Sequence, residues 1–391
     1  MRGKNSETAD QKAERTASSP QPSPAGKERE KNWRVSAALL DWFSKNARDL
    51  PWRRTRDPYG IWVSEIMLQQ TQVKTVIPYW NRWMKKLPTI QRLARARSET
   101  VHKLWEGLGY YTRARNLHKA ARLLVREHSG NLPRDFNQVH QLPGIGRYTA
   151  GAICSIVYDQ PAPILDGNVA RVLTRLFGVR SDPHEPKTNI LLWQTAGDLV
   201  VLASERRDLT KRPCSAFNQS LMELGALICT PKQPKCGLCP VSSFCSASLR
   251  GLTDQLPQKR KRPATTRRRF FAFILSRGNH FLVRRRPEGV VNAQLWEFPN
   301  IEIKAENGSL DHTARDLFGS IPGRLEDFCK ITHSITRYRI TLEAFWGQIP
   351  PGRGPRISGG RWLTLRELNR LPFASAHKKL LQRLPATRSF A

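Results

Sequence analysis

The stretch LPGIGRYTAG, residues 142–151, places two glycines directly before an apolar helical pattern. Gly144 and Gly146 lie in the expected turn, and Ala152, Ile153 and Ile156 follow at the spacing of one helix face. Such a turn presents backbone N–H groups at the positive end of a helix, where they can bind a phosphate oxygen without reading base sequence. The turn can equally be a tight connection between two packed helices, so alone it predicts only a helical hairpin.

A second motif, LDGNV at residues 165–169, follows about twenty residues downstream. It sets Asp166 beside Gly167 and Asn168, before a helical pattern that reaches Phe177. Taken alone, Asp166 has the position and chemistry of a helix N-cap. A functional role for its carboxylate needs support from other parts of the chain.

Four of the seven cysteines form a compact set with the spacing C-x6-C-x2-C-x5-C. Two disulfides are disfavoured in an intracellular protein, and a zinc site typically shows two close cysteine pairs, whereas this set has one. Four-cysteine ligation of a cubane cluster does not demand paired spacing. The pattern therefore favours a [4Fe-4S] cluster over zinc or no metal, held by Cys229, Cys236, Cys239 and Cys245. Cys154, Cys214 and Cys329 are expected to be buried or incidental thiols.

The order of these three motifs resembles the helix-hairpin-helix DNA glycosylase superfamily, endonuclease III branch, over roughly Trp33 to Ser246. Within this region PWR at 51–53 and WVSEIMLQQTQ at 62–72 resemble the MutY adenine glycosylases in particular. The resemblance implies a mostly α catalytic region of two helical subdomains with an iron–sulfur loop. It further implies a monomeric enzyme that removes adenine mispaired with 8-oxoguanine or guanine in double-stranded DNA.

Two carboxylates can supply the chemistry of N-glycosidic cleavage, which needs a proton for the departing base and stabilisation of an oxocarbenium-like sugar. Glu65 lies in an apolar helical setting between Val63 and Ile66, where desolvation favours the protonated form that a general acid requires. The structural alternative is that Glu65 is an ordinary helix carboxylate, held by a helix cap or an ion pair. By the resemblance, Asp166 stabilises the sugar cation or briefly bonds to it, and water completes the hydrolysis.

Tyr148 occupies the position where related bifunctional enzymes have a lysine that forms a Schiff base with the sugar. A phenol cannot form that imine, so we expect strand cleavage to be absent or weak. Base extrusion also needs a group that fills the gap, and the residues that match Gln70 and Tyr110 wedge beside 8-oxoguanine in the family. The residues that resemble pocket-lining or supporting positions are Trp52, Arg53, Gln69, Thr71 and Asn168. For Trp52 a plain core role is the alternative.

The charge of the chain points to a polyanionic partner. Its 391 residues carry 65 Lys and Arg against 32 Asp and Glu, a formal net charge of +33. Nucleic acid is the favoured partner, with a ribosomal or membrane-surface protein as the alternative. No apolar run approaches the ~18 residues of a membrane span, and the N-terminus lacks a signal-peptide core. We therefore expect a cytoplasmic protein of a reducing compartment, associated with the bacterial nucleoid.

Composition divides the chain into five segments. We expect a disordered tail over 1–32, the helical glycosylase domain over 33–228, the cluster loop over 229–250, a basic linker over 251–269 and an α+β domain over 270–391. In the last segment, an apolar run at 270–275, a turn at 277–280 and a return at 281–283 predict two strands. Alternation from Tyr338 to Trp346 predicts a further strand that is half buried.

The C-terminal segment resembles the Nudix-like recognition domain of MutY through RRRP at 284–287 and LWEFP at 295–299. The glutamate-rich metal-binding helix of Nudix hydrolases is missing after Asn300, so we do not expect triphosphate hydrolysis. Where the family has a Phe-Ser-His loop against 8-oxoguanine, the register from His333 places Ile335, Thr336 and Arg337. Thr336 can still donate a hydroxyl hydrogen bond, and Arg337 can replace the histidine.

Three other readings remain open at this point. A bifunctional pyrimidine-lesion glycosylase would have lysine at position 148. A thymine–guanine mismatch glycosylase could share Tyr148 and Asp166, but the setting of Glu65 favours adenine. A non-enzymatic DNA-binding protein with a cluster would tolerate loss of both carboxylates.

Overall fold

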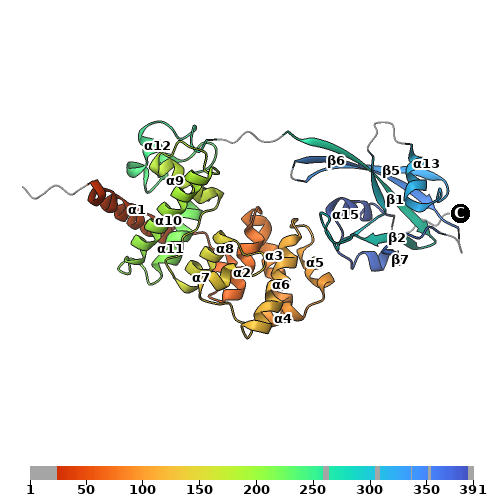
Figure 1. Cartoon of the computed structure of the whole chain (residues 1–391), viewed down its shortest axis with the longest axis horizontal. Coiled ribbons are helices and arrows are strands. Elements are labelled where there is room, and N and C mark those ends of the chain that lie inside the picture. Colours follow the sequence, from red (N-terminus) through yellow and green to blue (C-terminus); the bar gives the residue numbers. More distant parts are fainter. Residues whose placement is uncertain (1–23, 259–263, 304–308, 336, 351–353, 386–391) are drawn as a thin grey trace, which may run out of the picture.

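The computed structural model describes residues 24–258, 264–303, 309–335, 337–350 and 354–385. A helical region and a C-terminal sheet domain follow one another along the long axis of the molecule (Figure 1). Within the described residues, no helix is long and apolar enough to cross a membrane. The helical elements before the sheet are α1 (Pro24–Asn46), η1 (Pro51–Arg53), α2 (Pro58–Leu68), α3 (Val73–Lys86), α4 (Ile90–Arg95), α5 (Ser98–Trp105), α6 (Thr112–Glu127), α7 (Phe136–His140), α8 (Arg147–Ala152), η2 (Ile153–Val157), α9 (Gly167–Phe177), α10 (Pro186–Ser204), α11 (Pro213–Leu227), η3 (Cys236–Leu238), η4 (Ser242–Phe244) and α12 (Ser246–Leu249).

The helical region has two separate apolar cores. The first is built from α2 to α8 and centres on the buried rings of Trp62, Trp83 and Trp105. The second is built from α1 and α9 to α11, with Leu39 and Phe217 fully buried. Burial of apolar side chains against neighbouring helices is the main source of helix stability here, and α2 is buried on all sides from Tyr59 to Met67. The two cores form two lobes, and the space between them is available for a site.

Helix α1 begins at Pro24, inside the segment that the sequence predicts to be a disordered tail. Residues 1–23 lie outside the described part of the chain. The composition of 24–32 is polar, but charged side chains support the helix here: Arg34 pairs with Glu30 one turn away at 2.6 Å, and Arg29 lies 3.7 Å from Glu205. Such pairs contribute only a few tenths of a kcal/mol each, so they extend a helix that the core anchors further along.

The C-terminal domain is a mixed sheet with helices on both faces. Its strands run in the order β3-β2-β1-β6-β5, with β4 paired to β1 and β7 paired to β2. Strands β1 and β6 are parallel, and the other pairs are antiparallel. The elements are β1 (Thr266–Arg277), β2 (His280–Arg285), β3 (Trp296–Glu297), β4 (Asn300–Ile303), α13 (Leu310–Phe318), β5 (Leu325–Ile335), β6 (Tyr338–Gln348), β7 (Gly360–Thr364), α14 (Leu365–Leu368) and α15 (Ser375–Leu381).

Side chains of β1 alternate between the two faces of the sheet, as a strand period of two requires. Phe271 and Phe273 pack with Phe318 of α13, whereas Ile274 packs on the opposite face with Leu380 of α15. The strands that the sequence predicts at 270–275, 281–283 and 338–346 are confirmed within β1, β2 and β6. However, β1 begins at Thr266, within the segment that the sequence assigns to the linker.

Ion pairs across the sheet account for the early start of β1. Arg268 binds Glu302 of β4, and Arg269 binds Glu343 of β6 at 2.7 Å. A basic run therefore enters the sheet because acidic partners stand on the neighbouring strands, which the local sequence does not reveal.

Candidate active site

A cavity of about 960 Å³ lies between the two helical lobes. The C-terminal half of α2 forms one wall, and the N-terminus of α9 forms the opposite wall. The structure brings most of the predicted site residues together here. The predicted residues that line this cavity are Trp52, Arg53, Glu65, Gln69, Gln70, Thr71, Gly146, Tyr148, Asp166 and Asn168.

Glu65 lies on the buried face of α2, and only 5% of the residue is exposed. Its Oε2 accepts a hydrogen bond from the Tyr148 hydroxyl at 3.1 Å. The pKa of Glu65 is raised to about 7: burial and the charge of Asp166 raise it, while the Tyr148 hydrogen bond and the Arg53 charge lower it. Glu65 can thus hold a proton near neutral pH and release it to a base, as the sequence predicts for a general acid.

Tyr148 stands in the first turn of α8, directly after the glycine turn. Its hydroxyl lies between Glu65 and the Met222 sulfur, which is 3.2 Å away. Burial and the negative charges of Glu65 and Asp166 hold the pKa of this phenol well above its ordinary value. The neutral hydroxyl is therefore a fixed hydrogen-bond donor beside the acid.

Asp166 is the N-cap of α9, which is the role that its position in the sequence predicts. Its Oδ1 accepts from the backbone N–H groups of Asn168 and Val169, at 3.0 and 2.7 Å. The Asn168 side chain donates to Oδ2 at 3.1 Å. Arg171 in turn donates to the Asn168 Oδ1 at 2.9 Å, which fixes the amide orientation. These donors fix the orientation of the Asp166 carboxylate in the cavity wall.

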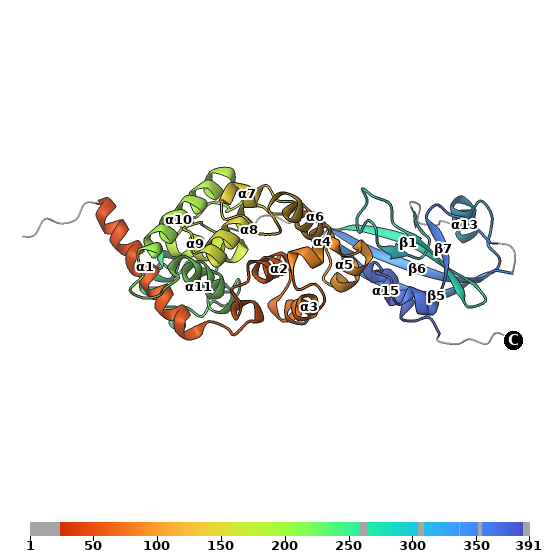
Figure 2. The ribbon, with the colours of Figure 1, turned by 90° about the horizontal axis from the view of Figure 1, so that it is seen from below.

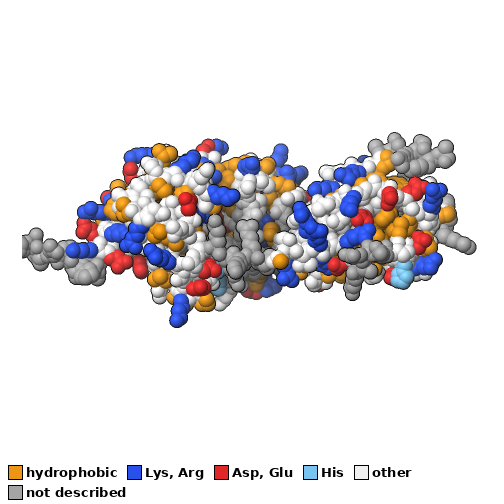
Figure 3. Space-filling view, turned by 90° about the horizontal axis from the view of Figure 1, so that it is seen from above, with side chains coloured by type: hydrophobic (Ala, Val, Ile, Leu, Met, Phe, Trp, Pro, Cys, Tyr) orange, Lys and Arg blue, Asp and Glu red, His pale blue; other side chains and the backbone are white. Residues whose placement is uncertain are grey.

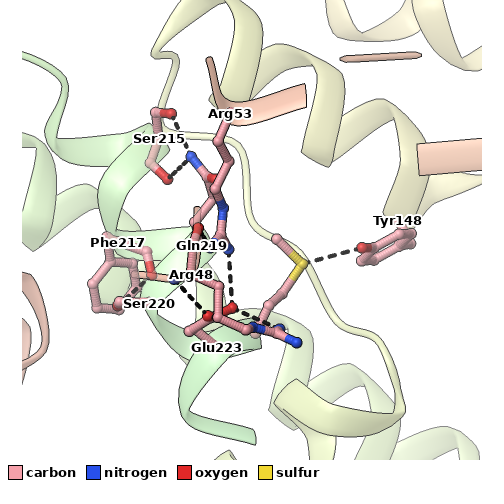
Figure 4. Close-up of polar contacts among 9 residues, drawn as sticks. Arg48, Arg53, Tyr148, Ser215, Phe217, Gln219, Ser220 and Glu223 are labelled. Atoms are coloured by element: carbon pink, nitrogen blue, oxygen red, sulfur yellow. Dashed lines mark hydrogen bonds and ion pairs between the residues drawn. The ribbon is translucent and has the colours of Figure 1, made fainter. Parts of the chain in front are cut away.

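Glu223 of α11, a carboxylate that the sequence analysis did not single out, also lines the cavity, and Figure 4 shows its contacts with Arg48 and Arg53. Glu223 of α11 is 1% exposed and binds two guanidinium groups, Arg48 at 2.6 Å and Arg53 at 3.0 Å. Burial alone would raise the pKa of Glu223, but the hydrogen bonds from both arginines lower it to about 2. Arg53 also donates to Gln219 at 2.9 Å. The pocket thus contains a fixed network of polar groups, and the ionised Glu223 contrasts with the protonated Glu65.

Gln70 and Tyr110, the predicted wedge residues, both have a left-handed backbone, with φ of 55° and 46°. Such a conformation is uncommon for residues with a side chain and is found where the surrounding structure imposes it. Half of Tyr110 is exposed, so its ring is available to a ligand. Gln70 and Tyr110 together line a second cavity of about 230 Å³, next to the hairpin residue Gly144.

Arg113 of α6 connects the segment before Gln70 to the segment before Tyr110, which we call the two wedge loops. It was not identified from the sequence. Its guanidinium lies over the rings of Trp105 and Tyr110, at 5.3 and 5.7 Å from their centroids. Burial lowers the pKa of Arg113 to about 10, so the group stays charged. It donates to acceptors on both loops: the carbonyl oxygens of Ile66, Met67, Gln69, Leu108 and Gly109 and the hydroxyl of Thr71.

The glycine turn has the geometry that the sequence predicts for a helical hairpin. Gly144 has a φ of 80°, and a Cβ atom there would lie 2.6 Å from the Cβ of Asn116. Gly146 is the N-cap of α8, and a Cβ atom on it would meet open space. Position 144 therefore requires glycine because of internal packing against Asn116. Gly146 instead leaves the backbone at the start of α8 open to an approaching group.

The four-cysteine loop packs beside α9, against the second core. Arg175 of α9 donates to the Cys229 sulfur at 3.3 Å, and the Cys245 thiol lies 3.4 Å from the Arg175 carbonyl. Burial raises the pKa of Cys239 to about 11, the N–H of Val241 lowers it, and the other three cysteines of the loop raise it further. Four sulfurs that share one partly buried site, with N–H and guanidinium donors around them, fit an iron–sulfur cluster.

No group of three or more His, Cys, Asp or Glu side chains in the described residues has the geometry to hold a single metal ion.

Of the two residues predicted to read the lesion, Arg337 does not line the main cavity. Thr336 lies outside the described residues. Arg337 stacks on the ring of Tyr338 at 5.2 Å and donates to its hydroxyl at 3.2 Å. A separate cavity of about 580 Å³ lies between the two domains, where Tyr110 faces residues of the sheet domain, among them Ser334 and Tyr338.

Lys and Arg side chains are spread over the surfaces of both domains (Figure 3). This distribution matches the formal net charge of +33. Such a distribution provides sequence-independent attraction to a phosphate backbone on both domains.

The fold, the paired carboxylates and the glycine hairpin define a helix-hairpin-helix base-excision DNA glycosylase. Residues 63–197 match the HhH-GPD superfamily base excision DNA repair proteins, residues 229–245 match the iron-sulfur binding domain of endonuclease III, and residues 270–383 match the NUDIX domain. A solved thermostable thymine-DNA glycosylase superposes with a TM-score of 0.50 at 29% identity, covering 57% of this chain and 99% of that protein.

The relatives narrow this class to one family. Human adenine DNA glycosylase is 35% identical over 88% of this chain and 73% of its own length. The adenine DNA glycosylase of Buchnera aphidicola from Schizaphis graminum is 38% identical over 69% of this chain and 75% of its own length. The chain belongs to the adenine DNA glycosylase family and is an N-glycosylase of base-excision repair. The predicted glycosylase region, iron–sulfur binding segment and Nudix-like domain are confirmed.

Proposed function

We propose that this enzyme removes adenine mispaired with 8-oxoguanine, and also with guanine, by hydrolysis without strand cleavage. The observation that carries this proposal is the pair of carboxylates with opposite properties in one cavity. Glu65 has a pKa raised to about 7 by burial, whereas Asp166 accepts hydrogen bonds from the start of α9. The raised pKa of Glu65 fits the acid role, and the fixed orientation of the Asp166 carboxylate fits the role of stabilising the sugar.

In this reaction Glu65 protonates the departing adenine ring, and Asp166 stabilises the positive charge that develops on the sugar. Tyr148 keeps the Glu65 carboxyl oriented through its hydrogen bond at 3.1 Å. Asn168 keeps Asp166 oriented in the same way, at 3.1 Å. A water molecule then adds to the sugar carbon and completes hydrolysis.

The monofunctional character of the enzyme rests on Tyr148. A lysine amine here would attack the sugar carbon and form an imine, from which the strand breaks. A buried phenol that donates to Glu65 has no such reactivity. The product is therefore an intact strand with an abasic site.

Extrusion of adenine requires unstacking of the duplex, and Gln70 and Tyr110 are placed to fill the resulting gap. The pocket that receives the base is lined by Trp52, Arg53 and Gln219, with polar groups that can meet the edge of a purine. Gln69 donates to Thr149 of α8 at 3.2 Å, and this bond supports the neighbouring Gln70. The Thr71 hydroxyl accepts from Arg113. The amide groups at Gly144 and Gly146 bind the phosphate backbone.

The iron–sulfur segment holds a [4Fe-4S] cluster on Cys229, Cys236, Cys239 and Cys245. A bound cluster fixes the 229–245 loop and keeps its basic residues oriented toward DNA. The chain acts on duplex DNA as a monomer, and the sheet domain supplies the recognition of 8-oxoguanine through Thr336 and Arg337. The boundaries near 228 and 250 and the start of β1 at Thr266 separate these three tasks.

The proposal is tested with purified holo-protein and four duplexes that contain A:8-oxoG, A:G, T:G or thymine glycol. Strands are analysed with and without alkali. We expect adenine release from the first two duplexes, no release from the last two and strand breaks only after alkali. If A:8-oxoG is not a substrate, the proposed specificity is wrong. Breaks without alkali would show that the enzyme is bifunctional.

A further inference from the structure

The sheet domain contacts the helical region next to the loop that carries Tyr110. Figure 2 shows α15 of the sheet domain beside α5 of the helical region. Leu295 and Ala374 of the sheet domain are buried in the first helical core, together with Trp105. Arg115 of α6 donates to the carbonyl of Ala293 at 3.0 Å. The two domains therefore share an apolar contact with polar groups at its margin.

Glu106, which follows α5 directly, is the acidic centre of this contact. Its Oε1 accepts from the backbone N–H of Phe373 at 3.0 Å, and its Oε2 lies 3.5 Å from the Lys378 ammonium of α15. Lys103 donates to Glu106 at 2.9 Å and also to the carbonyl of Leu371 at 2.9 Å. The side chain of Glu106 is only 15% exposed, so its charge is screened less than that of a surface carboxylate.

The backbone of Glu106 belongs to the Tyr110 loop. Its carbonyl accepts from the Tyr79 hydroxyl at 2.9 Å, and the next residue, Gly107, has a φ of 107°. The indole of Trp105 donates to the Gly109 carbonyl at 3.0 Å and holds the following part of the loop. Hydrogen bonds to its backbone thus fix the loop within the helical region. The carboxylate of Glu106 links the same loop to the sheet domain.

We infer that Glu106 is a positioning residue that couples the sheet domain to the Tyr110 loop. The interdomain cavity is bounded by residues 108–112 on one side and by residues of β5 and β6 on the other. The Glu106 contact stands beside this cavity and sets its width. It therefore controls where the sheet domain meets the base opposite adenine, and this lesion-specific consequence rests on the proposed function.

The test uses full-length holo-protein with Glu106→Ala, Glu106→Gln, Lys378→Met and the matched control Glu99→Gln. Glu99 is an exposed carboxylate in the first turn of the same helix α5. Hydrogen exchange of the peptide around Phe373 reports the contact itself. We expect the Phe373 amide to exchange about tenfold faster in Glu106→Ala, less so in Glu106→Gln, which keeps an acceptor oxygen, and unchanged in the control. An unchanged rate in Glu106→Ala would overturn the inference.

Single-turnover adenine release opposite 8-oxoguanine and opposite guanine reports the coupling. Loss of the charged contacts in Glu106→Ala is expected to slow release opposite 8-oxoguanine about tenfold, and opposite guanine by less than about threefold. Lys378→Met should show the same pattern more weakly, and its effect should not add to that of Glu106→Ala. Equal losses on both duplexes, or additive effects, would mean that Glu106 acts only within the helical region.

A failure of the proposed function is recognised separately. If the unmodified enzyme does not release adenine opposite 8-oxoguanine, the proposed function is wrong. The exchange of the Phe373 amide and the non-additivity with Lys378→Met then still decide whether Glu106 couples the domains.

Discussion

Replacement of Glu65 by glutamine should stabilise the protein while it removes activity, and the stabilisation should depend on pH. Burial raises the pKa of Glu65 from 4.5 to about 7, so ionisation costs about 3 kcal/mol more in the folded state than in the unfolded state. The protonated carboxyl contributes its full stability below pH 4.5 and loses that contribution as pH rises through 7. Glutamine has the same shape and cannot ionise, so it avoids this loss.

We therefore expect the stability difference between Glu65→Gln and the unmodified protein to grow by about 3 kcal/mol between pH 4.5 and pH 8. Urea unfolding of the holo-proteins, followed by circular dichroism at several pH values, measures this difference. Glu99→Gln, on an exposed carboxylate, should show no such trend. Adenine release by Glu65→Gln should fall by about 10²- to 10⁴-fold. A stability difference that is independent of pH, or that shrinks as pH rises, would refute the assignment of a buried protonated acid.

The other predictions concern the residues around this acid. Glu223→Gln leaves two guanidinium groups without their anion and should cost about 3–5 kcal/mol of stability, measured by urea unfolding; a loss below 1 kcal/mol would contradict the buried network. Arg113→Met should lower stability by about 2–4 kcal/mol and slow base extrusion. Extrusion is measured with a fluorescent base in place of adenine. Unchanged extrusion would show that the conformation of the two wedge loops does not depend on Arg113. Tyr148→Lys should yield alkali-independent strand breaks and a borohydride-trapped complex; absence of trapping would mean that position 148 does not face the sugar.

The candidate site residues whose local setting could be predicted from the sequence are those whose partners lie close in the chain. Asp166 caps a helix that begins at the next residue, and the amide of Asn168 is two positions away. Glu65 stands within a continuous apolar helix, so its desolvation can be read from its neighbours. In both cases the neighbours that determine the environment of the carboxylate are close in sequence. The motifs also predict the fold of the helical region.

The residues that the sequence reading missed depend on distant partners. Glu223 is ionised only because Arg48 and Arg53 approach it from 175 and 170 positions away. Glu223 is the single charged residue of α11, which was the available signal. Arg113 likewise gains its role from two loops that meet only in the folded protein. Charge runs were also misleading, because the basic start of β1 pairs across the sheet.

The most direct test of the whole account is the pH dependence of adenine release from an A:8-oxoG duplex under single-turnover conditions, from pH 5 to pH 9. Because burial raises the pKa of Glu65 to about 7, the acid is protonated below this value and loses its proton above it. We expect a constant rate below pH 7 and a fall of about tenfold per pH unit above it. A rate that stays constant or rises through pH 7 would contradict Glu65 as the proton donor.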